Sequence, residues 1–275
     1  MRAGFILPGG TAPKQLEQAL AAEAAGWDAV VVWEAGYGVD PWGLLAAIAA
    51  RTERVRLGTI LTPAPWRRPW KLASQVATVD QLSGGRAFVT LGLGALSDDL
   101  PQTGEITDRR ERAERLDETI DVMRALWSGE REYHGKVYDV TCADWLLDAA
   151  RPVQQPIPIW VAAVWPRPKS MRRGARCDGV VPEYDARRLG GRAGTPDDVR
   201  DLRAWLRDNR AGADIDVVGE GETPAGDPAA AAAKVAAWAE AGCTWWMETR
   251  WGSASSIDER LEVVDERIAA GPPRG

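Results

Sequence analysis

The chain has 275 residues, of which 45% are hydrophobic and 27% charged, and its formal net charge is −6. This mixture is typical of a soluble globular protein and not of a disordered or fibrous one. The acidic balance argues against nucleic acid or an anionic membrane as the main partner, because proteins that bind such surfaces concentrate basic residues. We therefore expect a small-molecule substrate.

Hydropathy and cysteine usage narrow the class of protein further. No stretch approaches the roughly 20 apolar residues of a membrane span, and the early apolar run at 5–7 is too short for a secretion signal. Cys142, Cys177 and Cys243 are odd in number and widely spaced, so neither a disulfide framework nor a zinc site is indicated. We expect a cytoplasmic protein without a metal site.

Short apolar or β-branched runs alternate with helical patterns from end to end, which predicts repeated βα units and a parallel sheet. Most of the runs are almost continuously apolar, as strands covered on both faces should be. Eight strands are expected, at residues 3–7, 29–33, 55–61, 87–92, 157–162, 179–182, 215–218 and 244–248. At this length the pattern predicts an α/β fold, a (β/α)8 TIM barrel forming one domain over 1–275.

The helices between the strands carry start and stop signals. A capping side chain precedes proline at three expected starts, which are Asp40-Pro41, Thr195-Pro196 and Asp227-Pro228. Glycine follows three expected helices, at 14–25, 69–82 and 229–241, where it suits a left-handed cap. These signals support the division into βα units.

One connection is longer than the others and predicts an insertion between the fourth and fifth strands, at about 95–156. A helix is expected over 107–128, because Leu116, Ile120 and Met123 fall on one stripe that can pack onto the barrel. Residues 133–138 read as a turn between two short extended pieces. No linker rich in Gly, Ser or Pro divides the chain.

The third and fourth units carry the most specific motifs. In chain order these are Leu57-Gly58-Thr59, Leu61-Thr62-Pro63, Asp80-Gln81-Leu82-Ser83-Gly84-Gly85-Arg86 and Leu91-Gly92-Leu93-Gly94. The succession continues with Arg112-Ala113-Glu114-Arg115-Leu116-Asp117-Glu118, His134-Gly135-Lys136-Val137-Tyr138 and Cys177-Asp178-Gly179-Val180. In this order the chain resembles the luciferase-like monooxygenase family of flavin-dependent oxidoreductases.

The resemblance implies a TIM barrel that holds FMN, or its deazaflavin analogue F420, at the C-terminal ends of the strands. That face is also where barrel enzymes build their active sites. Members of the family include oxygenases that use reduced FMN supplied by a flavin reductase, and enzymes that pass hydride between F420 and a small substrate. The resemblance further suggests a homodimer.

Four positions match the place where relatives hold the flavin ring. Thr59 and Ile60 correspond to a non-prolyl cis peptide behind the ring, with an ordinary trans strand end as the alternative. Gly92 and Gly94 would let a flat ring approach the backbone, with simple turn formation as the alternative.

The phosphate of the cofactor is expected after the fifth strand, where relatives have a glycine-rich turn. This chain has no glycine there, so the candidates are the amides of Ala163 and Val164 and the side chains of Lys169 and Ser170. The alternative is a solvated basic segment.

Titratable groups are few at the strand ends. Glu34 closes the second strand, where F420-dependent relatives often have histidine, and Ala95 stands where some place a glutamate, so both positions argue against the usual F420-dependent site. Glu34 is the catalytic candidate as a general acid or base, with pairing to an arginine as the alternative. His134 is the only histidine and lies in the insertion, so neither a catalytic role nor light emission is expected.

Tryptophan is unusually abundant, with 14 residues, and nine of them fall at or beyond strand ends. Part of this set would wall a pocket for a planar cofactor and an apolar or aromatic substrate, the rest packing between helices and strands. Adjacent strand residues face opposite sides, so only one of Trp245 and Trp246 can point inward. The pocket candidates are Trp33, Trp42, Trp66, Trp165, Glu248 and Trp251.

Three functions remain open. The preferred one is a monooxygenase in which reduced FMN activates oxygen and the protein supplies orientation and a dry cavity. The first alternative is F420-dependent hydride transfer, and the second is a family member that binds flavin or another ligand without catalysis. Hydrolytic barrels usually present His and Asp clusters for a metal, and the sequence shows no such cluster.

Overall fold

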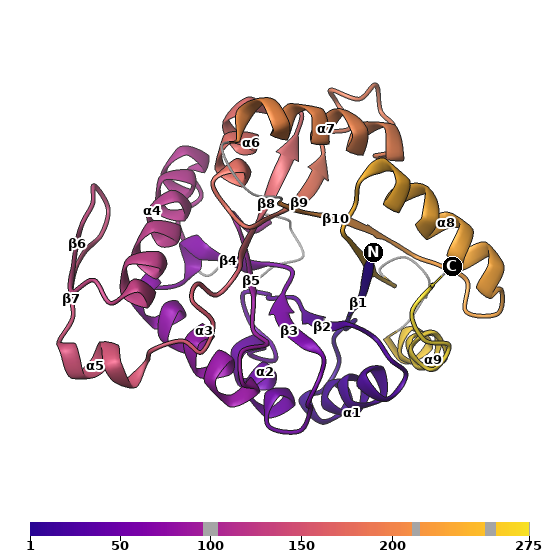
Figure 1. Cartoon of the computed structure of the whole chain (residues 1–275), viewed down its shortest axis with the longest axis horizontal. Helices are drawn as coiled ribbons and strands as arrows, with labels where there is room; N and C mark the ends of the chain where they lie inside the picture. The colour runs from indigo at the N-terminus through magenta and orange to yellow at the C-terminus, as the bar shows by residue number, and fades with distance from the viewer. Residues whose placement is uncertain (96–103, 211–214, 251–256, 275) are drawn as a thin grey trace. The chain divides into compact units, whose positions relative to one another are not determined.

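The computed structural model describes residues 1–95, 104–210, 215–250 and 257–274 (Figure 1). Two compact units make up the chain. Unit 1 comprises Met1–Val31 and Trp160–Gly275, and unit 2 comprises Val32–Ile159. Within the described ranges, no helix is long and apolar enough to cross a bilayer.

Unit 1 is built on parallel strands in the order β2-β1-β11-β10-β9-β8. The strands are β1 (Arg2–Ile6), β2 (Ala29–Val32), β8 (Ile159–Trp165), β9 (Gly179–Tyr184), β10 (Asp216–Gly221) and β11 (Trp245–Glu248). The helices are α1 (Ala12–Ala24), α6 (Pro168–Ala175), α7 (Pro196–Asn209), α8 (Pro228–Ala241) and α9 (Ile257–Ala269). Figure 1 shows α6, α7 and α8 outside the strands β8, β9 and β10.

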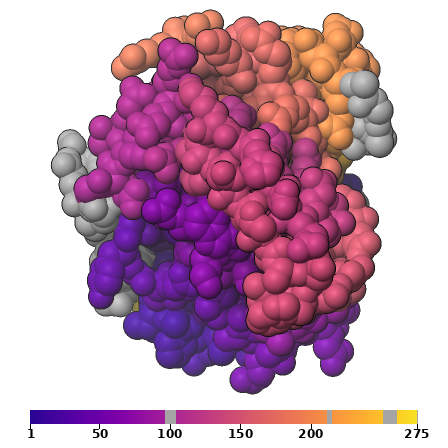
Figure 2. All heavy atoms as spheres, turned by 90° about the vertical axis from the view of Figure 1, so that its left-hand side faces the viewer, coloured from indigo at the N-terminus to yellow at the C-terminus, as the bar shows by residue number. Residues whose placement is uncertain are grey.

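Unit 2 holds the next strands and the insertion. Its elements are α2 (Pro41–Ala49), β3 (Arg56–Thr59), β4 (Thr62–Pro63), η1 (Ala64–Trp66), α3 (Pro69–Ser83), β5 (Val89–Gly92), α4 (Arg109–Ser128), β6 (Glu132–His134), β7 (Asp139–Thr141) and α5 (Asp144–Ala149). β4 pairs with β5 in parallel. Leu57 of β3 forms an isolated parallel bridge to Ala87, just before β5. β6 and β7 form an antiparallel hairpin beyond α4 (Figure 1), on the side of unit 2 that Figure 2 turns toward the viewer.

The predicted fold class is confirmed: the chain is an α/β protein of the (β/α)8 barrel type, with an insertion between β5 and β8. Each of the eight predicted strands is present in the predicted order, with β3 and β4 as two pieces of the third. The helix expected over 107–128 is α4, and the turn at 133–138 is the β6–β7 hairpin. The single-domain organisation stays a prediction.

β8 is longer than expected, and this changes the loop that follows it. The sequence placed its end at residue 162, whereas the strand continues to Trp165. Alternate residues of β8 face opposite sides. Ala163 and Trp165 pack into a cluster with Met171 of α6 and Leu202 of α7, while Trp160 meets Trp245 with ring centroids 5.6 Å apart.

The predicted capping signals are present. Asp40 and Asp227 each accept a hydrogen bond at a helix start, from Gly43 N at 2.7 Å and from Ala230 N at 2.9 Å. Gly84 and Gly242 end α3 and α8 in the left-handed conformation. Glycine reaches that region without the steric penalty of a side chain. These local rules fix where the βα units begin and end.

The start of α7 gives a testable stability prediction. Asp198 is 4% exposed, and its carboxylate accepts hydrogen bonds from Thr195 N at 2.8 Å and Arg192 Nη1 at 2.6 Å. The hydrogen bond from Arg192 holds the pKa of Asp198 below its ordinary value. The ionised group therefore stabilises the fold above the unfolded-state pKa near ~4, and this contribution is lost as the pH falls.

We expect Asp198→Asn to lower the free energy of unfolding by about 1 kcal/mol at pH 7, a modest value because Arg192 is half exposed. Urea unfolding of wild type and variant at pH 7 and below pH ~4 would measure the difference. It should shrink at the lower pH. An equal difference at both pH values would contradict the assignment.

Candidate active site

The carboxyl ends of the strands in unit 2 bring several predicted site residues together. Ile60 N donates a hydrogen bond to Val32 O at 3.0 Å, which ties the break between β3 and β4 to the end of β2. Trp33 and Glu34 follow Val32 directly. Parallel neighbours thus present the segments after β2, β4 and β5 at one edge, where α/β folds place their ligands.

The non-prolyl cis peptide lies between Ile60 and Leu61, one bond beyond the Thr59–Ile60 position expected from the resemblance. Thr59 is fully buried, and its hydroxyl donates to Thr90 O at 3.4 Å and accepts from Thr62 Oγ1 at 3.1 Å. The Thr59 side chain therefore links β3, β4 and β5. Ile60 is half-buried at this edge. Cofactor contact by Thr59 and Ile60 stays a prediction.

Gly92, the last residue of β5, and Gly94, just after it, do not leave the open space expected for a flat ring. A Cβ on Gly92 would lie 2.6 Å from Leu61 Cδ2, and one on Gly94 would lie 2.8 Å from Pro63 Cβ. Gly94 also has φ of +77°. The space left by the missing side chains is thus filled by Leu61 and Pro63 and is not open to a flat ring. The positive φ of Gly94 agrees with the turn-formation alternative, whereas at Gly92 the close contact with Leu61 is what leaves no room for a side chain.

Glu34 is a nearly buried carboxyl group with only one of its two oxygens hydrogen-bonded. Its side chain is 7% exposed, and Oε1 accepts a hydrogen bond from Arg67 Nε at 2.7 Å. Oε2 is buried without a hydrogen-bond partner. Burial raises the pKa of Glu34 above its ordinary value, and Arg67 offsets this only in part. The pairing with arginine foreseen from the sequence is present, yet one oxygen remains for another partner.

Arg112 is a functional candidate that the sequence reasoning missed. It is 3% exposed, and its Nη2 donates to the carbonyl oxygens of Leu93 and Gly94 just after β5. Its Nε is buried without a partner, and burial lowers the pKa of Arg112. A signal existed in the sequence: Arg112 precedes Leu116 and Ile120 at four-residue spacing, which places it on the buried stripe of α4.

The three tryptophans of unit 2 that were predicted to wall the pocket differ in how much of the side chain is exposed. Trp33 is 36% exposed, and Trp66 of η1 is half-buried. Trp42 of α2 is 2% exposed and belongs to the core. Trp33 and Trp66 therefore retain surface for a ligand. For Trp42 the structure favours the packing alternative.

In unit 1 the structure corrects two of the pocket residues. Trp165 packs among the side chains of α6 and α7, as described above, because its position in β8 faces the helices. Glu248 is 0% exposed, and its oxygens accept hydrogen bonds from Thr223 N at 2.7 Å and Trp246 Nε1 at 3.0 Å. Neither side chain is available to a substrate. Trp251 lies outside the described residues.

The expected phosphate loop is also corrected. Ala163 and Val164 belong to β8 and pair in register with Pro182 and Glu183 of β9. Val164 N donates to Ser170 Oγ at 2.9 Å, so this amide is already used within the chain. Ala163 is fully buried in the cluster under α6. Lys169 is exposed at the start of α6, and phosphate contact by Lys169 and Ser170 stays a prediction.

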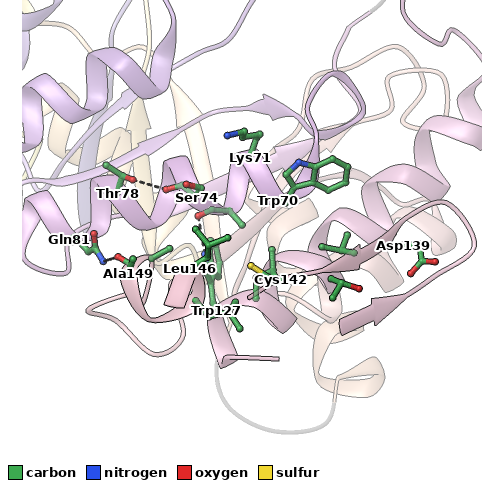
Figure 3. Close-up of a pocket in the computed structure, with 16 residues that line it drawn as sticks. Trp70, Lys71, Ser74, Thr78, Gln81, Trp127, Asp139, Cys142, Leu146 and Ala149 are labelled. Atoms are coloured by element: carbon green, nitrogen blue, oxygen red, sulfur yellow. Dashed lines mark hydrogen bonds between the residues drawn. The ribbon is translucent and has the colours of Figure 1, made fainter. Parts of the chain in front are cut away.

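A groove of about 610 Å³ lies elsewhere on unit 2 (Figure 3). α3, α4, β7 and α5 line it, with Trp70, Trp127, Cys142 and Leu146 among the side chains. At one end of the groove, Gln81 donates a hydrogen bond to Ala149 O at 3.0 Å. Glu34, Thr59 and Arg112 are not part of its lining. The groove is therefore separate from the candidate active site.

A family model described as luciferase-like monooxygenase matches residues 3–270. This range includes every motif on which the resemblance was based.

Curated relatives match part of the chain. The F420-dependent glucose-6-phosphate dehydrogenase of Segniliparus rotundus is 38% identical over 166 residues, which are 55% of this chain and 48% of that protein. The oxygenase component of the flavin-dependent trigonelline monooxygenase of Acinetobacter baylyi is 35% identical over 125 residues, 45% of this chain and 34% of that protein. The chain thus spans about half the length of these relatives, or less.

Solved structures match nearly the whole chain. An F420-dependent secondary alcohol dehydrogenase, solved with an F420-acetone adduct, superposes with a TM-score of 0.73 at 17% identity, covering 98% of each chain. The monooxygenase RslO1 from Streptomyces bottropensis gives a TM-score of 0.72 at 23% identity, also covering 98% of each chain. At these identities the likeness shows the shared fold.

Proposed function

The chain belongs to the luciferase-like monooxygenase family, and we propose that within it the protein is an F420-dependent oxidoreductase acting on a small substrate with a hydroxyl or carbonyl group. The observation that carries the proposal is Glu34, a buried carboxyl group with one free oxygen at the end of β2. Reversible hydride transfer to or from such a substrate requires a proton acceptor or donor beside the substrate oxygen.

The residues of unit 2 fit a cofactor of this kind. Arg112 Nε is one of the buried polar atoms of unit 2 that lack a hydrogen-bond partner, and a bound cofactor would satisfy it, whereas Glu34 Oε2 is left for the substrate. The backbone at Thr59 and Ile60 would support the ring, and Arg112 would attract an anionic group. When bound, F420 supplies the hydride chemistry at its ring.

Glu34 would handle the proton. In the direction of alcohol oxidation, its ionised Oε2 would accept the hydroxyl proton of a substrate whose carbon-bound hydride the oxidised cofactor would take up, while Oε1 would keep its hydrogen bond to Arg67. In the reverse direction the protonated carboxyl group returns the proton to the carbonyl oxygen. A pKa raised by burial suits this role, because a general base works best when its pKa lies near the operating pH.

The curated relatives favour F420 over FMN. The dehydrogenase of Segniliparus rotundus and that of Amycolatopsis mediterranei, at 38% and 36% identity over 166 residues each, are both F420-dependent by name. Each match covers about half of the relative's length, so we do not transfer the substrate glucose 6-phosphate from those proteins to this chain. Because these relatives are F420-dependent, we now prefer F420-dependent hydride transfer to the FMN monooxygenase that the sequence favoured. The homodimer stays a prediction.

A monooxygenase that uses reduced FMN from a partner reductase is the second candidate. The specific support is the match to an oxygenase component in Acinetobacter baylyi, together with the absence of a glutamate at Ala95. The exposed surface of Trp33 and Trp66 would suit a planar apolar substrate in this case.

Titration of the purified apoprotein separately with F420, FMN and reduced FMN, followed by fluorescence, tests the proposal. We expect saturable binding of F420 with weaker binding of either form of FMN. Binding of reduced FMN alone would replace the proposal with the monooxygenase. Binding of none of the three would overturn both.

A further inference from the structure

Arg67 is fixed by hydrogen bonds from all three of its guanidinium nitrogens to three different side chains. It lies between η1 and α3 and uses each guanidinium nitrogen separately. Nε donates to Glu34 Oε1 at 2.7 Å, Nη1 to Gln75 Oε1 at 3.0 Å and Nη2 to Asp40 Oδ2 at 2.9 Å. The side chain is 17% exposed. A planar fork bound at three corners cannot rotate away from the carboxyl group.

The two residues that brace Arg67 are themselves fixed. Asp40 is the N-cap of α2, where its other oxygen accepts from Gly43 N at 2.7 Å. Gln75 lies within α3, two turns after Arg67. The guanidinium group is therefore anchored to the N-cap of α2 and to the middle of α3. Glu34 receives one hydrogen bond from a rigid donor, and this leaves Oε2 without a partner.

We propose that Arg67, braced by Asp40 and Gln75, is the positioning residue for Glu34, holding Oε1 so that Oε2 faces the reacting group. The role of Glu34 as the proton-handling group rests on the proposed function. The arrangement of Arg67, Asp40 and Gln75 does not depend on which cofactor binds. Arg67 itself touches no reacting atom and acts through the carboxyl group.

The same geometry makes the charge on Glu34 depend on two neighbours of opposite sign. In the described part of the chain, the charged groups facing Glu34 are Arg67, from the segment before α3, and Asp40, from α2. Thr62 of β4 brings a neutral hydroxyl group to Glu34, and the neutral amide of Gln75 from α3 contacts Arg67. Arg67 favours the ionised carboxylate, whereas Asp40 disfavours it and shares the same cation.

Two substitutions should therefore move the titration of Glu34 in opposite directions. Arg67→Gln removes the adjacent positive charge, so the pKa of Glu34 should rise. Asp40→Asn removes the repulsion and leaves Arg67 to Glu34, so the pKa should fall. Asparagine caps a helix as well as aspartate does, so Asp40→Asn should fold even if Arg67→Gln proves unstable.

Carbon-13 NMR of the cofactor-free protein, with labelled glutamate, measures this directly. The Glu34 carboxyl signal is assigned by its loss in Glu34→Gln, and its midpoint is then compared in wild type, Arg67→Gln, Asp40→Asn and Arg67→Lys. Arg67→Lys should restore part of the wild-type midpoint, because it returns the charge without the planar fork. Arg51→Gln, at an exposed position outside this cluster, is the matched control.

A midpoint that stays in place in Arg67→Gln, or that moves the same way in both variants, would overturn the proposal. With cofactor and substrate, Arg67→Gln should lower kcat about tenfold or more near neutral pH and move the acid limb of the rate profile upward, with KM less affected. Opposite shifts in the NMR titration without any turnover would sustain the positioning role and refute the proposed function instead.

Discussion

Replacing Glu34 with glutamine should lower turnover by about 100-fold or more, the usual contribution of a general acid or base. Glutamine is nearly isosteric, and its amide oxygen can still accept the hydrogen bond from Arg67 Nε. The change therefore removes proton transfer at Oε2 while leaving the local packing intact. Steady-state rates at saturating cofactor, together with a cofactor titration of the variant, measure the two effects separately.

The affinity for the cofactor should stay near that of wild type, because Glu34 is assigned to the substrate and not to the ring. Glu17→Gln, on the exposed side of α1 in unit 1, removes the same charge outside the contacts of Glu34 and should leave turnover unchanged. Wild-type rates in Glu34→Gln would remove Glu34 from the mechanism. Loss of cofactor binding with loss of rate would assign the residue to binding instead.

The second large effect concerns the stability of unit 1. Glu248 is fully buried between two arginines, with Arg250 Nη2 at 3.3 Å and Arg267 Nε at 3.4 Å from Oε1. Arg250 and Arg267 are 6% and 2% exposed. Glu248→Gln would leave Arg267 buried beside a neutral amide and Arg250 with only the carboxylate of Glu222, 3.6 Å from its Nη1. We expect the free energy of unfolding to fall by about 3–5 kcal/mol, the usual result of breaking a buried ion pair.

Urea unfolding followed by tryptophan fluorescence measures this loss. Glu240→Gln, exposed on α8, is the control and should change stability by no more than about 0.5 kcal/mol. Adding Arg267→Met to Glu248→Gln should cost less than the sum of the two single changes, because one uncompensated charge is then removed. A loss below about 1 kcal/mol in Glu248→Gln would show that the arginines find other partners.

The boundaries of the fold were readable from the sequence because they obey local rules. The apolar run that became β2, the proline after Asp227 and the glycine after α8 each act within a few residues of themselves. The two-residue period of a strand also correctly separated Trp245 from Trp246: the first meets Trp160, and the second meets Trp238 of α8.

The candidate site was only partly readable, and the errors share one cause. Trp165 and Glu248 stand near strand ends, yet each faces the helices, because the side of the sheet depends on where a strand starts and ends in its ladder. Extending β8 by three residues turned an expected loop into strand. Gly92 was expected to leave space, but whether space is open depends on Leu61 in the neighbouring strand segment.

By itself, therefore, the sequence determined the βα units, their capping and the family, since these follow from local periodicity and from ordered motifs. Only the tertiary structure decided which polar groups meet. Glu34 and Arg67 are 33 residues apart in the chain, and no local rule pairs them. Their contact arises because Ile60 bonds to the end of β2 and Asp40 and Gln75 brace the guanidinium group from two helices. The unpartnered oxygen of Glu34 is a consequence of that packing.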